Sequence, residues 1–112
     1  MLHVAKEINK GIIFIRLEGD LNKNNFYKLT ETINYLLYDQ GVIAYVLNLE
    51  NINILDHYLI SILQNKLTEI FLSCGSVALC GVSKNLQKKI GKRASELFYI
   101  TEEKEVFQYI SM

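Results

Sequence analysis

The pattern of apolar and polar positions changes period several times along this chain, and each change marks a new predicted element. Strands are expected where branched and aromatic residues alternate or run together. Helices are expected where apolar residues recur every three or four positions between polar or glycine-containing ends. The predicted strands are residues 3–8, 11–18, 42–49, 76–79 and 97–100, and the predicted helices are residues 26–37, 59–71, 83–90 and 101–110, the last with Val106, Phe107 and Ile110 on its apolar face.

The order of these elements predicts an α/β fold. A turn signal at Asn9-Lys10-Gly11 separates the first two strands, so they are expected to form an antiparallel hairpin. The later strands alternate with helices, which is typical of parallel strands joined by right-handed crossovers. The run 42–49 is almost continuously apolar, as in a strand covered on both faces. We therefore expect a single domain, residues 1–112, with a mixed sheet of four to five strands and about four helices.

The residues around the predicted helix ends are of the types that stabilise such ends. Asn24 or Asn25 is expected to cap the first helix, and Gly41 follows its last turn. Ser83 is expected to cap the third helix. Lys88 and Lys89 suit the negative C-terminal end of that helix.

The junction between the run 42–49 and the second long helix is the most informative part of the chain. Asp56 lies there and is expected to cap the helix by accepting hydrogen bonds from its free backbone N–H groups. His57 and Tyr58 follow directly, at a helix start that is a natural contact site for an anion or a partner surface. Ser61 lies one turn inside the helix, where we expect restricted access.

Composition narrows the classes of function. Half of the 112 residues are apolar, enough for one compact core, and proline is absent. Twelve basic residues balance twelve acidic ones, so no net field favours nucleic acid or an anionic membrane. No apolar run approaches the roughly 20 residues that span a bilayer, and the first residues lack a secretory signal pattern. A cytoplasmic protein without membrane insertion is expected.

The motifs of common enzymes and cofactor sites are missing from the sequence. Gly-x-Ser-x-Gly is absent, and the glycine-flanked segment 75–81 lacks the Lys-Ser/Thr pair of a phosphate-binding loop. Cys74 and Cys80 fit neither a redox pair nor a zinc site, and both are expected to be buried and inert. His3 and His57 have no acidic cluster beside them. We expect no catalytic residue, no metal and no cofactor.

Several strings, in their order and spacing, resemble the STAS family, the fold of bacterial anti-sigma factor antagonists. The resemblance runs from about residue 4 to residue 110. The string Leu-Glu-Gly-Asp-Leu-Asn resembles the family's L-x-G-x-L-D turn, with Asn22 at the usual Asp. The string Ile-Leu-Asp-His-Tyr-Leu-Ile occupies the place of the family's D-S-S-G-L signature. The strings that carry the resemblance are residues 17–22, 46–52, 54–60 and 75–83.

The resemblance implies a site and a departure from the family pattern. In the family, the Ser or Thr after the Asp is phosphorylated by a partner kinase that is also an anti-sigma factor. Here His57 stands at the phosphoacceptor position, and Tyr58 and Leu59 replace the second Ser and the Gly. The usual serine switch is therefore expected to be absent. The partner-binding residues implied are Asp56, His57, Tyr58, Leu59, Asn22, Lys23 and Asn24.

Two functions remain open at this point. The first is a non-enzymatic signalling module that binds an anti-sigma factor or serine-kinase-like protein. The second is a STAS regulatory or structural subunit of a larger complex, of the lipid-transport ATPase type or a stress-signalling scaffold. An apolar exposed face on the second helix would favour the subunit, and a polar, mobile helix start with transient binding would favour signalling. Ligand binding is a weaker third alternative, and a homodimer is left open.

Overall fold

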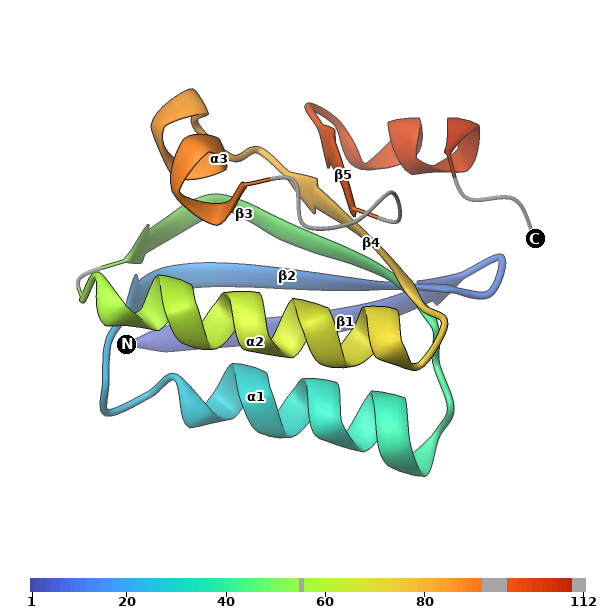
Figure 1. Ribbon diagram of the computed structural model, residues 1–112, viewed down its shortest axis with the longest axis horizontal. Helices are drawn as coiled ribbons and strands as arrows, with labels where there is room; N and C mark the ends of the chain where they lie inside the picture. Colours follow the sequence, from blue (N-terminus) through green and yellow to red (C-terminus); the bar gives the residue numbers. More distant parts are fainter. Residues whose placement is uncertain (55, 92–96, 110–112) are drawn as a thin grey trace.

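The computed structural model shows an α/β domain built on one mixed sheet; the structure describes residues 1–54, 56–91 and 97–109 (Figure 1). The strand order is β1-β2-β3-β4-β5, with β1 antiparallel to β2 and the other neighbours parallel. The predicted α/β class and mixed sheet are confirmed. The elements are β1 (Leu2–Asn9), β2 (Ile12–Leu21), α1 (Tyr27–Asn34) with its π-helical continuation η1 (Tyr35–Asp39), β3 (Ala44–Ile54), α2 (Tyr58–Leu72), β4 (Ser76–Cys80), α3 (Lys84–Ile90), β5 (Leu97–Ile100) and the 3-10 helix η2 (Glu103–Gln108).

The predicted hairpin is present. Lys10 and Gly11 form a two-residue loop in which both have positive φ, 54° and 79°. That backbone matches the twist of two antiparallel strands, and glycine adopts it without steric cost. The loop leaves Asn9 opposite Ile12, and this pairing fixes the register of β1 and β2 along their length.

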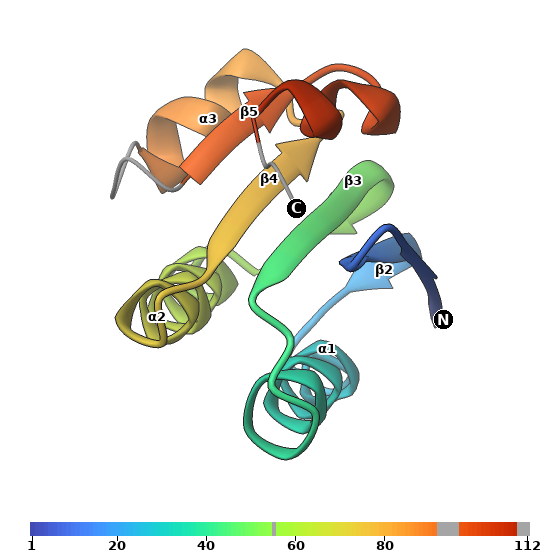
Figure 2. The same cartoon turned by 90° about the vertical axis from the view of Figure 1, so that its right-hand side faces the viewer.

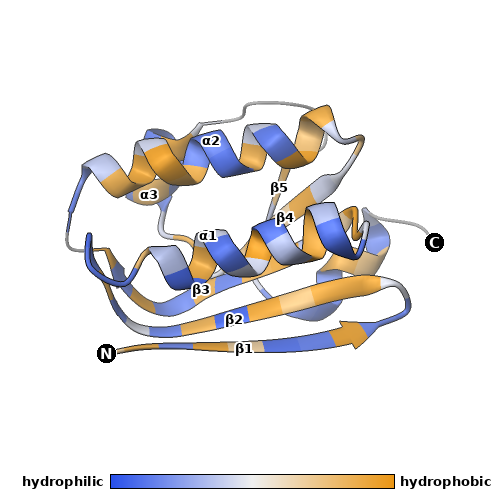
Figure 3. Ribbon diagram, turned by 90° about the horizontal axis from the view of Figure 1, so that it is seen from below, coloured by the Kyte–Doolittle hydropathy of each residue, from blue (hydrophilic) through white to orange (hydrophobic). Residues whose placement is uncertain are grey.

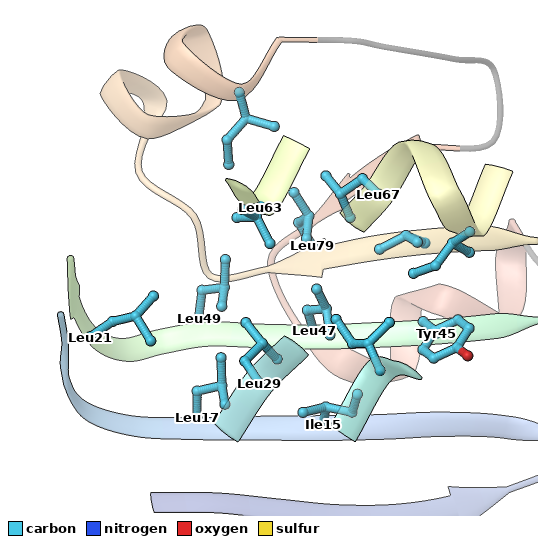
Figure 4. Packing of buried hydrophobic residues seen from close by; sticks show 14 of the residues in the cluster. Ile15, Leu17, Leu21, Leu29, Tyr45, Leu47, Leu49, Leu63, Leu67 and Leu79 are labelled. Atoms are coloured by element: carbon cyan, nitrogen blue, oxygen red, sulfur yellow. The ribbon is translucent and has the colours of Figure 1, made fainter. Parts of the chain in front are cut away.

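The large core lies between the sheet and the helices α1 and α2, which cover one face (Figure 2). Figure 4 shows how the inward side chains of β2 and β3, such as Ile15 and Leu47, meet Leu29 of α1 and Leu63 of α2. Figure 3 shows apolar and polar residues interspersed along both helices, and the buried residues of both belong to this core. A smaller cluster on the opposite face, which includes Phe14 and Val46, is covered by Val106 of η2.

Two local predictions are wrong. The segment after Thr101 forms a 3-10 helix instead of an α-helix: Glu102 and Glu105 form a capping box, but Val106 is its one buried residue and Phe107 is 38% exposed. Ile110, which we placed on the same face, lies outside the described residues. Cys80 is buried as predicted, whereas Cys74 is exposed. Cys74 takes a left-handed φ of 65° just after the C-cap of α2, and this places its side chain on the surface.

The predicted ends of the third helix are confirmed. The Ser83 hydroxyl accepts a hydrogen bond from the backbone N–H of Leu86 at 3.2 Å, and Lys88 and Lys89 lie in the last turn. Gln64 of α2 donates through Nε2 to the carbonyl oxygens of Lys89 and Ile90, both at 3.0 Å. These two bonds hold α3 against α2.

Candidate functional site

The candidate site lies at the edge of the sheet where the parallel strands end. The register pairs Asp20 with Asn53 and Leu21 with Ile54, so β2 and β3 end side by side. The chain then turns into α1 after β2 and into α2 after β3. Ligands and partners of α/β proteins are commonly bound at this carboxyl edge, because the connecting loops meet there.

Asp56 joins these two connections instead of capping α2. Its Oδ2 accepts a hydrogen bond from the backbone N–H of Lys23 at 3.1 Å, and no side chain caps the helix. The prediction that Asp56 is the N-cap is therefore wrong. The N-cap position is held by His57, which already has helical dihedral angles of −61° and −33°. A side-chain cap needs an extended backbone at the capping residue, and His57 does not have one.

The loop after β2 is held rigid by its asparagines. The Asn22 Oδ1 accepts hydrogen bonds from the backbone N–H groups of Asn24 and Asn25, at 2.8 and 3.1 Å. The Asn25 Oδ1 accepts in return from the Asn22 N–H at 2.9 Å, and its Nδ2 donates to the Asp20 carbonyl at 2.8 Å. This reciprocal arrangement is that of a capping box. The prediction that Asn24 or Asn25 caps α1 is wrong, because the N-cap of α1 is Phe26 and it has no side-chain cap. Asn22 and Asn25 organise the turn that precedes the helix.

The exposed part of the site is a small polar surface. We call Lys23, Asn24, Asp56, His57 and Tyr58 the tip surface. Lys23, Asn24 and His57 are exposed, Tyr58 is 51% exposed, and Asp56 is half-buried.

Two predictions about neighbouring residues need correction. Leu59, placed by the sequence among the partner-binding residues, is only 1% exposed because it packs in the core with Leu63. Its side chain is therefore not available to a partner. Ser61, for which restricted access was expected, is exposed. A helix whose buried face includes positions 59, 60 and 63 leaves position 61 on the outward side.

A hollow of about 190 Å³ lies beside the tip surface, and sequence reasoning missed it. The strand that precedes it was expected to end at Leu49, but β3 continues to Ile54. The alternation of Ile52 and Ile54 with polar residues was the available signal. Apolar and polar residues both line the hollow: Ile52, Ile54, His57, Ile60, Ser83, Asn85, Leu86 and Lys89.

A second polar cluster lies on the sheet face that carries η2. Arg16 donates through Nε and Nη2 to the Glu103 carboxylate, at 2.9 and 2.8 Å, and through Nη1 to Glu7 at 2.8 Å. The hydrogen bonds from Arg16 hold the pKa of Glu103 below its ordinary value. Asn48 donates to the same carboxylate at 2.9 Å. These bonds attach η2 to β2 and β3 and so serve the fold.

The environment of the nearby Cys80 thiol favours its neutral form. Burial raises the pKa of Cys80 to about 11, and four glutamates around it act in the same direction. Its Sγ lies 3.4 Å from the Thr101 carbonyl oxygen. Within residues 1–54, 56–91 and 97–109, no three His, Cys, Asp or Glu side chains gather as a metal site would need. Over the same residues, no helix combines the length and apolar character that a membrane span requires.

Comparison with known proteins assigns this fold to a family. The model of the STAS domain matches residues 3–107. Among solved structures, the unphosphorylated form of the anti-sigma factor antagonist SpoIIAA is similar, with a TM-score of 0.77, 17% identity, and coverage of 98% of this chain and 100% of that chain. The phosphorylated form of the Bacillus cell fate determinant SpoIIAA gives a TM-score of 0.74 at 17% identity, covering 96% of this chain and 100% of that chain.

A putative anti-sigma factor antagonist from Thermotoga maritima gives a TM-score of 0.77 at 16% identity, covering 97% of this chain and 95% of that chain. At such identities these structures show a common fold. The family model spans nearly the whole chain and includes both loops of the tip surface. The chain therefore belongs to the STAS domain family.

Proposed function

We propose that this chain is a protein-binding signalling module of the anti-sigma factor antagonist type. Its partner is an anti-sigma factor or serine-kinase-like protein that contacts the tip surface. The observation that carries the proposal is the hydrogen bond from the Lys23 N–H to Asp56. It joins two loops 33 residues apart in the chain into one ordered surface, and a pre-ordered surface loses less conformational entropy on binding.

The tip surface has exposed side chains that a partner can contact, but the residue directly after Asp56 has no hydroxyl group that a serine kinase could phosphorylate. The phosphorylated residue of the family is expected directly after Asp56, where this chain has His57. A phosphoserine adds about −1.5 to −2 charges and releases a partner by repulsion and desolvation. An imidazole cannot enter that reaction without different kinase chemistry. We propose that binding here is not released by serine phosphorylation, so that protein abundance sets the output.

The outward side of α2 favours reversible binding over permanent assembly. In the middle of the helix this side carries Ser61, Asn65 and Thr68, which are all exposed and polar. A subunit held permanently in a complex normally buries a larger apolar face. The alternative role, a fixed subunit of a transport or stress-signalling complex, therefore has less support.

Site-specific cross-linking tests where the partner binds. A photo-reactive phenylalanine analogue is placed at Tyr58, at the start of α2, or at Leu72, the matched control at the other end of the same helix; Leu72 is 80% exposed. In the native cells, we expect position 58 to capture a kinase-like protein and position 72 to capture none. Capture of that protein only from position 72 would refute the tip surface as the contact.

Phosphorylation of three variants tests the lost switch. The captured kinase is incubated with the wild type, His57→Ser and His57→Ala, and intact mass is measured. We expect one added phosphate on His57→Ser alone, because only this variant restores a hydroxyl beside Asp56. A phosphate on wild-type His57 would overturn the claim. Unmodified His57→Ser in a bound complex would show that the partner is not a serine kinase.

A further inference from the structure

Strand β1 forms one edge of the sheet, and no other strand of the described residues pairs with its outer side (Figure 3). It is eight residues long and pairs with β2 without a bulge or a register shift. Most proteins protect such an edge with proline, a bulge, a short strand or charged side chains, and β1 has only the last of these, in Lys6 and Glu7. This chain contains no proline, and β1 also exposes Ile8 to 66%. The edge is therefore a ready template for one more strand.

The hairpin determines which backbone groups are free. The two-residue loop makes Asn9 and Ile12 a hydrogen-bonded pair, and such pairs alternate along an antiparallel ladder. Residues 3, 5, 7 and 9 therefore bond to β2, while Leu2, Val4, Lys6 and Ile8 direct their N–H and C=O groups outward. The Leu2 carbonyl accepts a hydrogen bond from Lys28 Nζ at 3.4 Å, as an outward group can.

Symmetry limits how a second copy can pair with this edge. A two-fold axis perpendicular to the sheet leaves each side chain on its own face, so a residue can oppose only positions of the same parity. The axis must therefore pass beside one residue, which then lies directly opposite the same residue of the second copy. The central candidates are Val4, Ala5 and Lys6.

The charges along β1 select one of these three. An axis at Lys6 places two lysine side chains directly opposite each other, which is unfavourable. An axis at Val4 leaves Glu7 and Ile8 beyond the end of the opposing strand. An axis at Ala5 places Glu7 opposite His3 in both halves and aligns Ile8 with Leu2. A His imidazole can donate a hydrogen bond to a carboxylate, so this register has one complementary pair in each half, in which Glu7 keeps its bond to Arg16 through one oxygen.

We propose that two copies of this chain associate through β1, antiparallel, about an axis at Ala5. The two sheets then form one continuous sheet. In this register Lys6 of one copy exchanges both backbone hydrogen bonds with Val4 of the other. Ile8 pairs with Leu2 in the same way, and the Leu2 carbonyl then accepts from the Ile8 N–H in place of Lys28 Nζ. The exposed Ile8 side chain is covered, and the tip surface is not part of the interface.

Cysteine scanning tests the register. Cys74 is exposed, so the scan uses a Cys74→Ser background; Cys80 is buried. Only residues that face their own copy can form a symmetric disulfide, because the Cα atoms must lie within about 4.4–6.8 Å. Under mild oxidation we expect Ala5→Cys to form a disulfide-linked dimer faster than Val4→Cys or Lys6→Cys. Equal rates at the three positions, or a faster rate at 4 or 6, would overturn the register.

Sedimentation equilibrium tests the association itself. We expect the wild-type mass to rise with concentration from 12.9 kDa toward twice that value. Lys6→Pro removes an outward N–H that β2 does not use, so it should stay monomeric and keep its melting temperature in dilute solution. Lys6→Thr, the control, should still dimerise. A wild type that stays monomeric at all concentrations, or a Lys6→Pro protein that dimerises like it, would refute the proposal.

Discussion

Removal of the Asp56 carboxylate tests the bond on which the tip surface depends. The Lys23 N–H to Asp56 bond is 3.1 Å long and connects the loop after β2 with the start of α2. A hydrogen bond to a charged group contributes about 1.5–3 kcal/mol when buried. Because Asp56 is only half-buried and Lys23 is exposed, we expect Asp56→Ala to lower the free energy of unfolding by about 1 kcal/mol, or about 4 °C in Tm.

Amide exchange followed by NMR locates the loss, and urea unfolding measures its size. In Asp56→Ala, we expect the Lys23 amide to exchange about fivefold faster, because about 1 kcal/mol of protection is lost. The Leu59 amide should be unaffected, since it donates to the backbone carbonyl of Asp56 at 3.1 Å. Asp56→Asn keeps an acceptor oxygen and is the matched control, with stability close to the wild type. Unchanged Lys23 exchange together with faster exchange at Tyr58 and Leu59 would show that the carboxylate caps the helix after all.

Three further predictions concern the fold. Tyr45→Phe should raise stability by about 1 kcal/mol in urea unfolding, because the buried Tyr45 hydroxyl has no hydrogen-bond partner among the described residues. Burial raises the pKa of Tyr45 to about 12, so this tyrosine ionises first in the unfolded chain, and the wild type should lose more stability than Tyr45→Phe as the pH rises from 10 to 12. Gly75→Ala should lower the free energy of unfolding by about 2 kcal/mol or more, since a Cβ there would lie 2.5 Å from an Ile70 methyl. In the control, Gly41→Ala, the Cβ meets nothing within 4 Å, so the loss should be only about 1 kcal/mol, from the φ of 67°. The pKa of Glu103 is lowered, so its contribution is present above its unfolded pKa and is lost as the pH falls; Arg16→Met should show a shallower loss of stability in acid titration, and an unchanged acid slope would contradict this.

The core positions could be predicted because burial leaves a periodic trace in the sequence. Leu59, Leu63, Leu67 and Ile70 recur at helical spacing, and all four are buried. The same periodicity did not reveal that Leu59 is buried in the core and therefore cannot contact a partner. An apolar residue at a helix start is equally typical of a core and of a contact surface, and only the rotation of α2 about its axis distinguishes the two.

The lower half of β3 shows why strand ends are hard to predict. Glu50, Asn51 and Asn53 are exposed polar residues, so the strand was expected to end at Leu49. The strand continues because β2 offers a partner as far as Leu21, after a register shift between Arg16 and Glu18. The alternation of Ile52 and Ile54 with polar residues was a weak local signal, and the pairing that confirms it involves a strand distant in the sequence. The hollow beside the tip surface was missed for that reason.

The sequence by itself determined the element order, the hairpin, the mixed sheet and the position of His57 at the place of the family's acceptor. These features depend on local periodicity, turn residues and motif spacing, which are properties of neighbouring positions. Only the tertiary structure decided what Asp56 does. Its carboxylate could accept from the helix start beside it or from the Lys23 N–H of another loop, and it accepts from Lys23. The parallel pairing of β2 with β3 brings that loop within hydrogen-bonding distance.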